Sequence, residues 1–179
     1  MKIGWSSTIL LIQVILCGSG ITQAKHTHSY EQMHFSAEHT GVEEQVPIPE
    51  DVLAILRQDE MVRTLLEDEK LSAEKLPRTW FSASAIHLSN PGQVDLVVVG
   101  EGPILGANVT TFWVFCSTPH GHELVLTAPE HDLVVKRGRW KGYREIELTS
   151  ATAVGFSRML LRWDGRKYAA YREKSEHIQ

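Results

Sequence analysis

Two groups of apolar residues between residues 49 and 76 recur at helical spacing. They are Val52, Ile55 and Leu56, followed by Val62, Leu65 and Leu66. Residues three and four apart share one face of a helix, so each group predicts an amphipathic helical segment. The polar residues 58–60 separate the groups and predict either two short helices or one bent helix. Pro49, Glu50 and Asp51 favour a helix N-terminus, because proline suits a first turn and carboxylates suit the positive end of the helix dipole.

From residue 78 to 173 the pattern changes to alternation with period two, interrupted by short turn segments. The alternating segments are 81–86, 94–99, 109–116, 123–126, 133–135, 146–148 and 159–163. Period two is that of a β-strand, so we expect Phe112 and Val114 on one face of their strand and Trp113 on the other. The sequence therefore predicts an α+β fold, in which a short N-terminal helical segment packs on an antiparallel β-meander or a small barrel or sandwich. We expect residues 49–173 to form one folded unit, with residues 49–76 helical and 78–173 as its β-body.

Asp164-Gly165 is the clearest turn signal in the chain. Asp-Gly between two strands favours a two-residue hairpin turn, because both central positions take positive φ. Such a turn predicts that Leu161 pairs with Tyr168 on one face of the hairpin.

The first 24 residues have the pattern of a secretory signal peptide. Lys2 precedes an apolar run over residues 9–16, and Thr22-Gln23-Ala24 places small residues before a cleavage site. The run is too short to cross a membrane, so we expect a secreted or periplasmic protein with no transmembrane helix after cleavage. Cys17 follows Leu16, where a lipoprotein site has a small residue, and the sequence leaves its lipidation open.

Residues 25–48 have few apolar positions and no periodicity, which predicts a flexible leader. Four histidines lie in it, namely His26, His28, His34 and His39. Histidine-rich tracts bind metals by composition, and whether these histidines do so is open at this level.

Composition narrows the classes of function. The chain has 179 residues, of which 42% are hydrophobic, and a formal net charge of −4. This composition supports a hydrophobic core and lacks the excess of basic residues that nucleic-acid binding requires. Removal of the signal peptide leaves Cys116 as the only cysteine, so no intrachain disulfide is expected. Cys116 lies in an alternating segment and is expected to be a buried, inert thiol.

Residues 86–98 resemble the core motif of FG-GAP β-propeller blades, in which two strands flank a calcium-binding loop that ends in Gly-x-x-Asp-Leu. Gly92, Asp95 and Leu96 match that ending. His87, Ser89 and Pro91 occupy positions where the motif has oxygen ligands, and calcium needs six to eight oxygens. The resemblance therefore implies a strand-loop-strand element without the calcium. More broadly, the β-body looks like small secreted bacterial proteins of unknown function, which implies a compartment and a shape.

Catalytic motifs are missing from the sequence: it has no Gly-x-Ser-x-Gly elbow and no phosphate-binding loop. We therefore predict no catalytic residue and no cofactor. One alternative is a metal-dependent hydrolase that uses His120, His122 and His131, because a catalytic zinc needs three such ligands.

The leading hypothesis is a non-enzymatic binding module. Its partner surface is predicted on the loop 136–143, where Trp140 lies among cations. The candidate partner-binding residues are Arg139, Trp140, Lys141 and Tyr143. Exposed aromatic residues at loop tips often contact partners, and we expect a cell-envelope protein or polysaccharide rather than a nucleic acid.

Overall fold

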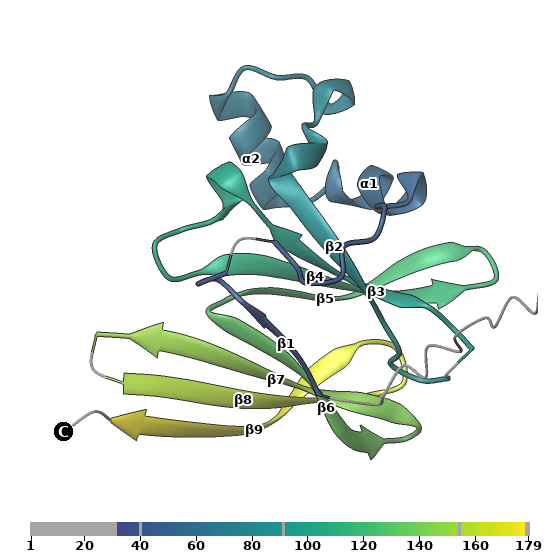
Figure 1. The fold of residues 1–179 in the computed structure, drawn as a ribbon, viewed down its shortest axis with the longest axis vertical. Coiled ribbons are helices and arrows are strands. Elements are labelled where there is room, and N and C mark those ends of the chain that lie inside the picture. The colour runs from purple at the N-terminus through teal and green to yellow at the C-terminus, as the bar shows by residue number, and fades with distance from the viewer. Residues whose placement is uncertain (1–31, 40, 91, 154, 178–179) are drawn as a thin grey trace, which may run out of the picture.

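The chain folds into three layers in the computed structural model, which describes residues 32–177 apart from residues 40, 91 and 154. Two helices lie on one face of a four-stranded sheet, and a five-stranded sheet packs against its other face (Figure 1). The predicted signal peptide, Cys17, His26 and His28 lie outside the described residues.

The strands and helices follow one another in a simple order. The elements are β1 (Met33–Ser36), α1 (Glu50–Leu56), α2 (Glu60–Asp68), β2 (Phe81–Ile86), β3 (Asp95–Gly100), β4 (Thr110–Thr118), β5 (Gly121–Glu130), β6 (Asp132–Trp140), β7 (Tyr143–Thr152), β8 (Gly155–Trp163) and β9 (Tyr168–His177). Short 3-10 helices lie at Ala73–Lys75, Arg78–Trp80 and Gly102–Ile104.

Both sheets are antiparallel and are built mainly as meanders. The four-stranded sheet has the order β2-β3-β4-β5, and the five-stranded sheet has the order β1-β6-β7-β8-β9. Apart from β1, each strand pairs with its neighbour in sequence. This arrangement agrees with the predicted antiparallel α+β class, and the two sheets stack as a sandwich.

Two hydrophobic cores hold the layers together. Val97, Val99 and Phe112 belong to the core between the sheets, whereas Trp113 and Phe115 belong to the core between the helices and the four-stranded sheet. The strand β4 therefore buries both faces, with its side chains alternating between the two cores as its sequence predicted.

Part of the predicted flexible leader is ordered. Residues 33–36 form β1, which pairs antiparallel with β6 and places Phe35 opposite Leu133. Phe35 is 7% exposed and belongs to the core between the sheets. Beyond β1, Ala37 N donates to the carbonyl of His131. The prediction of a leader is wrong for this stretch, because one buried aromatic residue and one strand partner are enough to order a short edge strand.

The β8–β9 connection is longer than predicted. Trp163 pairs with Tyr168, and Leu161 pairs with Ala170. The carboxylate of Asp164 accepts hydrogen bonds from the backbone N–H groups of Arg166 and Lys167, which favours a four-residue loop. From Trp163 to Leu161 the register shifts by two residues, so the side chains there keep their predicted faces. A bulge between Leu160 and Leu161 then shifts the register by one more residue, and Leu160 pairs with Arg172.

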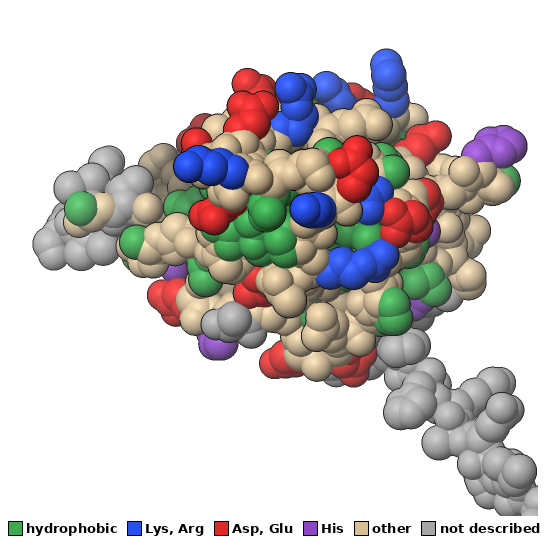
Figure 2. All heavy atoms as spheres, turned by 90° about the horizontal axis from the view of Figure 1, so that it is seen from above, with side chains coloured by type: hydrophobic (Ala, Val, Ile, Leu, Met, Phe, Trp, Pro, Cys, Tyr) green, Lys and Arg blue, Asp and Glu red, His purple; other side chains and the backbone are tan. Residues whose placement is uncertain are grey.

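The outer surface of the helical layer carries charged side chains of both signs around an apolar area (Figure 2). The partly buried helical residues Ile55, Met61 and Leu65 pack against the core between the helices and the four-stranded sheet. Among the described residues, no helix combines the length and the apolar composition needed to cross a bilayer.

Candidate functional site

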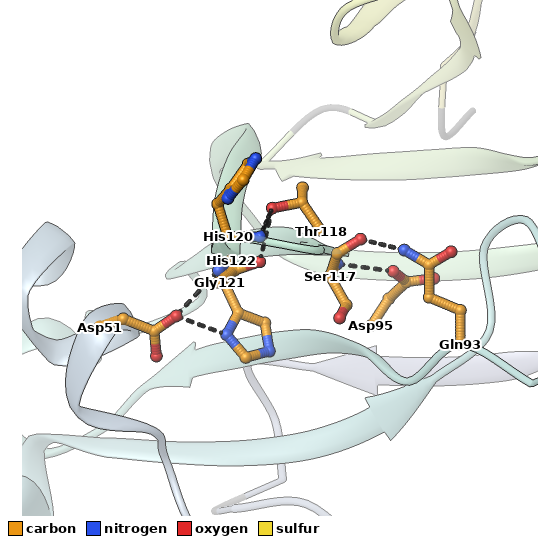
Figure 3. Close-up of polar contacts among 8 residues, drawn as sticks. All are labelled: Asp51, Gln93, Asp95, Ser117, Thr118, His120, Gly121 and His122. Carbon is orange, nitrogen blue, oxygen red and sulfur yellow. Dashed lines mark hydrogen bonds and ion pairs between the residues drawn. The ribbon is translucent and has the colours of Figure 1, made fainter.

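The β4–β5 hairpin is tied to α1 by an aspartate–histidine pair (Figure 3). Asp51 Oδ2 accepts hydrogen bonds from both the backbone N–H and the Nδ1–H of His122, each at 2.8 Å. His122 is mostly buried, with 18% of its side chain exposed. The bond from the His122 ring is the main reason that the pKa of Asp51 lies below its ordinary value. The pair joins the first turn of a helix to the first residues of a strand.

Gly121 allows this close approach. Its φ is +119°, and a Cβ at this position would lie 2.7 Å from Asp51 Oδ2. Only glycine meets both conditions without strain.

Asp95, the first residue of β3, joins its own strand to the β2–β3 loop and to β4. It is fully buried, and its two oxygens accept hydrogen bonds from Leu88 N at 2.8 Å and Ser117 N at 2.9 Å. The side chain of Gln93 donates to the carbonyl of Ser117 beside it (Figure 3). Burial raises the pKa of Asp95 above its ordinary value, and the two N–H donors oppose that shift. The carboxylate therefore has a structural role: it holds the β2–β3 loop and β4 to the start of β3.

The three histidines of the alternative metal set do not meet. The His120 ring is exposed and points away from the His122 ring (Figure 3). His131 follows the other end of β5, ten residues of strand away, which is about 30 Å. In the described parts of the chain, no group of three or more His, Cys, Asp or Glu side chains could hold a metal ion.

His131 instead lies beside a pocket of about 340 Å³ on the outer face of the five-stranded sheet. The pocket is lined by His131, Asp132, Val134, Glu147, Thr149, Phe156 and Arg158. The His131 ring donates from Nδ1 to the carbonyl of Asn108, and its Nε2 is 3.6 Å from Glu38 Oε1. Asp132 Oδ1 is 3.2 Å from Nε2 of His34.

Sequence reasoning missed this second cluster. The sequence places Asp132 next to His131. His34 and Glu38, however, belong to the stretch that was predicted to be a flexible leader. His34 and Glu38 lie close to Asp132 and His131 because β1 pairs with β6, and no local sequence pattern predicts that pairing.

Trp140 lies on the outer face of the five-stranded sheet and is 44% exposed. The guanidinium of Arg162 lies over its ring at 4.5 Å and over the Tyr171 ring at 3.6 Å. Glu145 accepts a hydrogen bond from Arg162 Nε at 2.6 Å. These four side chains come from β6, β7, β8 and β9 and form a row across the sheet. We call Trp140, Arg162 and Tyr171 the aromatic–arginine stack.

The other predicted partner-binding residues have different roles. Arg139 donates from one guanidinium nitrogen to the carbonyls of Leu88, Ser89 and Gly142. Tyr143 stacks on Trp163 with ring centroids 4.3 Å apart. Both residues therefore support the hairpin, whereas Lys141 is exposed at its tip and donates to the carbonyl of Asp164.

Basic side chains gather at this end of the sheet. The contact of Lys141 with Asp164 brings the β6–β7 turn next to the β8–β9 loop. The exposed cations of the end of β6 and of these two segments are Arg137, Arg139, Lys141, Arg166 and Lys167. The backbone N–H groups of Lys167 and Arg166 hold the pKa of Asp164 below its ordinary value. The carboxylate therefore stays charged and stabilises the β8–β9 loop through these hydrogen bonds.

Cys116 is a buried thiol, as expected. Burial, assisted by the charges of Asp95 and Glu123, raises its pKa to about 12. The thiol therefore stays protonated at neutral pH, and the thiolate that nucleophilic chemistry needs is not formed.

Comparison with known proteins finds no matching family model, no similar curated protein and no similar solved structure.

Proposed function

We propose that this protein is an exported, non-enzymatic binding module, secreted or periplasmic, that holds an acidic polysaccharide of the cell envelope. The observation that carries this proposal is the aromatic–arginine stack. It lies on the sheet face that no described element covers, beside a cluster of basic side chains.

The charge distribution supports an anionic ligand. The whole chain has a formal net charge of −4, yet five exposed cations gather on the end of β6, the β6–β7 turn and the adjoining β8–β9 loop. Arg137, Arg166 and Lys167 have no ion-pair partner within the described part of the chain. Local fields of this kind raise the concentration of oppositely charged ligands near the surface.

The rings support a sugar ligand. A pyranose presents an apolar C–H face and a rim of hydroxyl groups, so it fits an exposed aromatic ring flanked by hydrogen-bonding side chains. Trp140 and Tyr171 provide the rings, and Glu145 provides acceptors for hydroxyl groups. Because Arg162 is already fixed between the two rings, little side-chain entropy is lost when a ligand binds.

The test uses titration calorimetry with a uronate polymer, polygalacturonate, and with neutral dextran. We expect binding of polygalacturonate alone, and weaker binding as salt rises, because salt screens exposed charges. Trp140→Ala should weaken binding about tenfold, the order expected for an aromatic anchor at an interface. The control is Leu124→Ala, which removes an exposed apolar side chain from β5 on the other sheet.

A second pair of variants tests the charges. Arg166→Gln combined with Lys167→Gln should weaken binding and flatten its salt dependence, whereas Lys75→Gln in the helical layer should leave binding unchanged. Equal binding of dextran, or full binding by the Trp140 variant, would overturn the proposal. Capture of a defined acidic envelope protein by a surface that binds neither polymer would replace the polysaccharide as partner.

A further inference from the structure

We propose that the pocket on the outer face of the five-stranded sheet binds a free α-amino acid with an apolar side chain. The pocket has a volume of about 340 Å³ and is lined mainly by residues of β6, β7 and β8. Ligand pockets measure about 300–1,000 Å³, so this space suits a small molecule rather than a polymer. The site shares no residue with the aromatic–arginine stack and is independent of the polysaccharide surface.

The strand register aligns three of the lining residues in one row across the sheet. Asp132 of β6 pairs with Thr149 of β7, and Thr149 pairs in turn with Arg158 of β8. Leu133 and Leu148, which alternate with them, belong to the core, so the row lies on the outer face. Neighbouring strands are about 4.8 Å apart, so the backbones that carry the two charged side chains are about 10 Å apart. The row therefore presents a carboxylate, a hydroxyl group and a guanidinium in that order.

The guanidinium of Arg158 is available to a ligand. Arg158 is exposed, and it forms no ion pair with a carboxylate of the described residues. The charged residues beside it on β9, Lys174 and Glu176, form an ion pair with each other at 2.8 Å. A guanidinium binds a carboxylate through two parallel hydrogen bonds, so Arg158 can hold the carboxylate of an amino acid in one orientation.

The carboxylate of Asp132 has no partner that is permanently positive. Within the described chain its ion-pair contacts are with the imidazoles of His34 at 3.2 Å and His131 at 4.0 Å, and histidine is charged only when protonated. The side chain of Asp132 is 18% exposed, so water and salt screen its charge less than that of a surface carboxylate. An ammonium group brings a full positive charge and three hydrogen-bond donors to such a carboxylate.

The second carboxylate of the pocket is already neutralised within the protein. Glu147 Oε1 lies 3.1 Å from Lys136 Nζ. This pairing leaves Asp132 and Arg158 as the two charges of the pocket without a permanently charged partner, one at each end of the row. A zwitterion complements both charges, whereas Arg158 would repel a simple amine and Asp132 would repel a simple acid.

Apolar surface in the same pocket favours an apolar side chain on the ligand. The ring of Phe156 lines the pocket and is 42% exposed, and Val134 lines it from β6. An aromatic ring left in contact with water gains free energy when apolar groups cover it. The side chain of leucine or phenylalanine would cover Phe156 while the two charged groups of the amino acid meet Asp132 and Arg158.

The test is titration calorimetry of the tag-free protein with L-leucine and three relatives that each lack one feature. N-acetyl-L-leucine lacks the ammonium charge, L-leucinamide lacks the carboxylate, and glycine lacks the apolar side chain. We expect L-leucine to bind and each relative to bind at least about tenfold more weakly. The loss of a hydrogen bond to a charged group, or of a buried aliphatic side chain, corresponds to about that factor or more.

Two variants assign the charges to their residues. Arg158→Gln should weaken the binding of L-leucine at least about tenfold and should not weaken that of L-leucinamide, which has no carboxylate to lose. Asp132→Asn should weaken the binding of L-leucine in the same way and should not weaken that of N-acetyl-L-leucine. The matched controls are Arg172→Gln on β9 and Asp68→Asn on α2, both at exposed positions, and they should bind L-leucine normally.

The ligand series is measured on the unmodified protein, so its outcome does not depend on the folding of a variant. An amino-acid site is ruled out if L-leucine does not bind at millimolar concentration. It is also ruled out if N-acetyl-L-leucine or L-leucinamide binds as tightly as L-leucine, because the pocket would then recognise an acid or an amine alone. Equal binding of glycine would overturn the preference for an apolar side chain.

Discussion

Asp95 is a carboxylate whose two oxygens are both committed to backbone N–H groups inside the protein. Water is excluded from it, and this burial outweighs the two donors, so its pKa is raised. The folded protein therefore binds the Asp95 proton more tightly than the unfolded chain does. By linkage, the stability that comes from this proton is complete below the ordinary pKa of 3.8 and is lost as the pH rises through the folded pKa.

Asp95→Asn removes this titration. The free energy of unfolding of the unmodified protein, measured relative to that of the variant, should fall as the pH rises from about 3.5 to 7. Urea unfolding at a series of pH values measures the difference, and all other titrating groups cancel in it. A difference that is constant with pH, or that grows as the pH rises, would contradict the assigned pKa shift. The variant itself should be destabilised by about 1–3 kcal/mol, because the amide leaves one buried N–H unpaired.

Gly121 offers a second test at a single residue. Gly121→Ala introduces both positive-φ strain and a methyl group 2.7 Å from Asp51 Oδ2. Gly165 has a similar φ of +126°, and nothing lies within 4 Å of a Cβ built there, so Gly165→Ala isolates the strain. We expect Gly121→Ala to cost about 1–3 kcal/mol of unfolding free energy and Gly165→Ala to cost less.

The two glycine variants are compared by urea unfolding. Asp51→Ala, added to Gly121→Ala, should recover part of the loss by removing the carboxylate that the methyl group meets. Equal costs for the two glycines would mean that the approach of Asp51 plays no role.

At the scale of elements, the sequence pattern predicted correctly those features that depend on neighbouring residues alone. The alternation of residues 109–116 assigned Phe112 and Trp113 to opposite faces correctly, because the side-chain direction in a strand depends only on position. The β8–β9 loop length was wrong, since the Asp164 side chain caps two N–H groups and outweighs the Asp-Gly preference. β1 was missed because its only strong apolar residue, Phe35, is flanked by polar residues and depends on β6 for its partner.

Helix α2 depends on one side chain that also reaches the sheet. Asp59 Oδ1 accepts from Met61 N and Val62 N at the helix N-terminus, and Asp59 Oδ2 accepts from Trp113 Nε1 at 2.9 Å. Asp59→Ala should therefore cost about 2–4 kcal/mol, which combines a lost N-cap with an unpaired indole N–H. Urea unfolding followed by tryptophan fluorescence measures it.

Two comparisons sharpen the Asp59 prediction. Asp59→Asn keeps an acceptor for the helix and should cost less than Asp59→Ala. Asp68→Ala, at the exposed end of the same helix, should leave the free energy of unfolding nearly unchanged. A cost for Asp59→Ala as small as that for Asp68→Ala would show that the cap and the indole bond contribute little.

At the scale of the whole molecule, the candidate sites depend on contacts between distant parts of the chain. The pairs Asp51–His122 and His34–Asp132 each join an N-terminal residue to the β-body, and no spacing in the sequence brings them together. The exposure of Trp140 was predicted from its cationic neighbours. Its position at one end of a row across four strands, under the guanidinium of Arg162, was not predicted, because that row exists only once the register of β6 to β9 is set.

The N-terminal strand is therefore expected to contribute to global stability. Phe35→Ala removes a side chain that is 7% exposed in the core between the sheets, and it should lower the free energy of unfolding by about 3 kcal/mol. His39→Ala, three residues beyond β1 and exposed, should change it by less than about 0.5 kcal/mol. If the segment were a flexible leader, the two variants would have the same free energy of unfolding, because removing a side chain that contacts nothing in the folded state does not change it. A large, selective loss in the phenylalanine variant would mean that the β-body needs β1 to close one edge of its core.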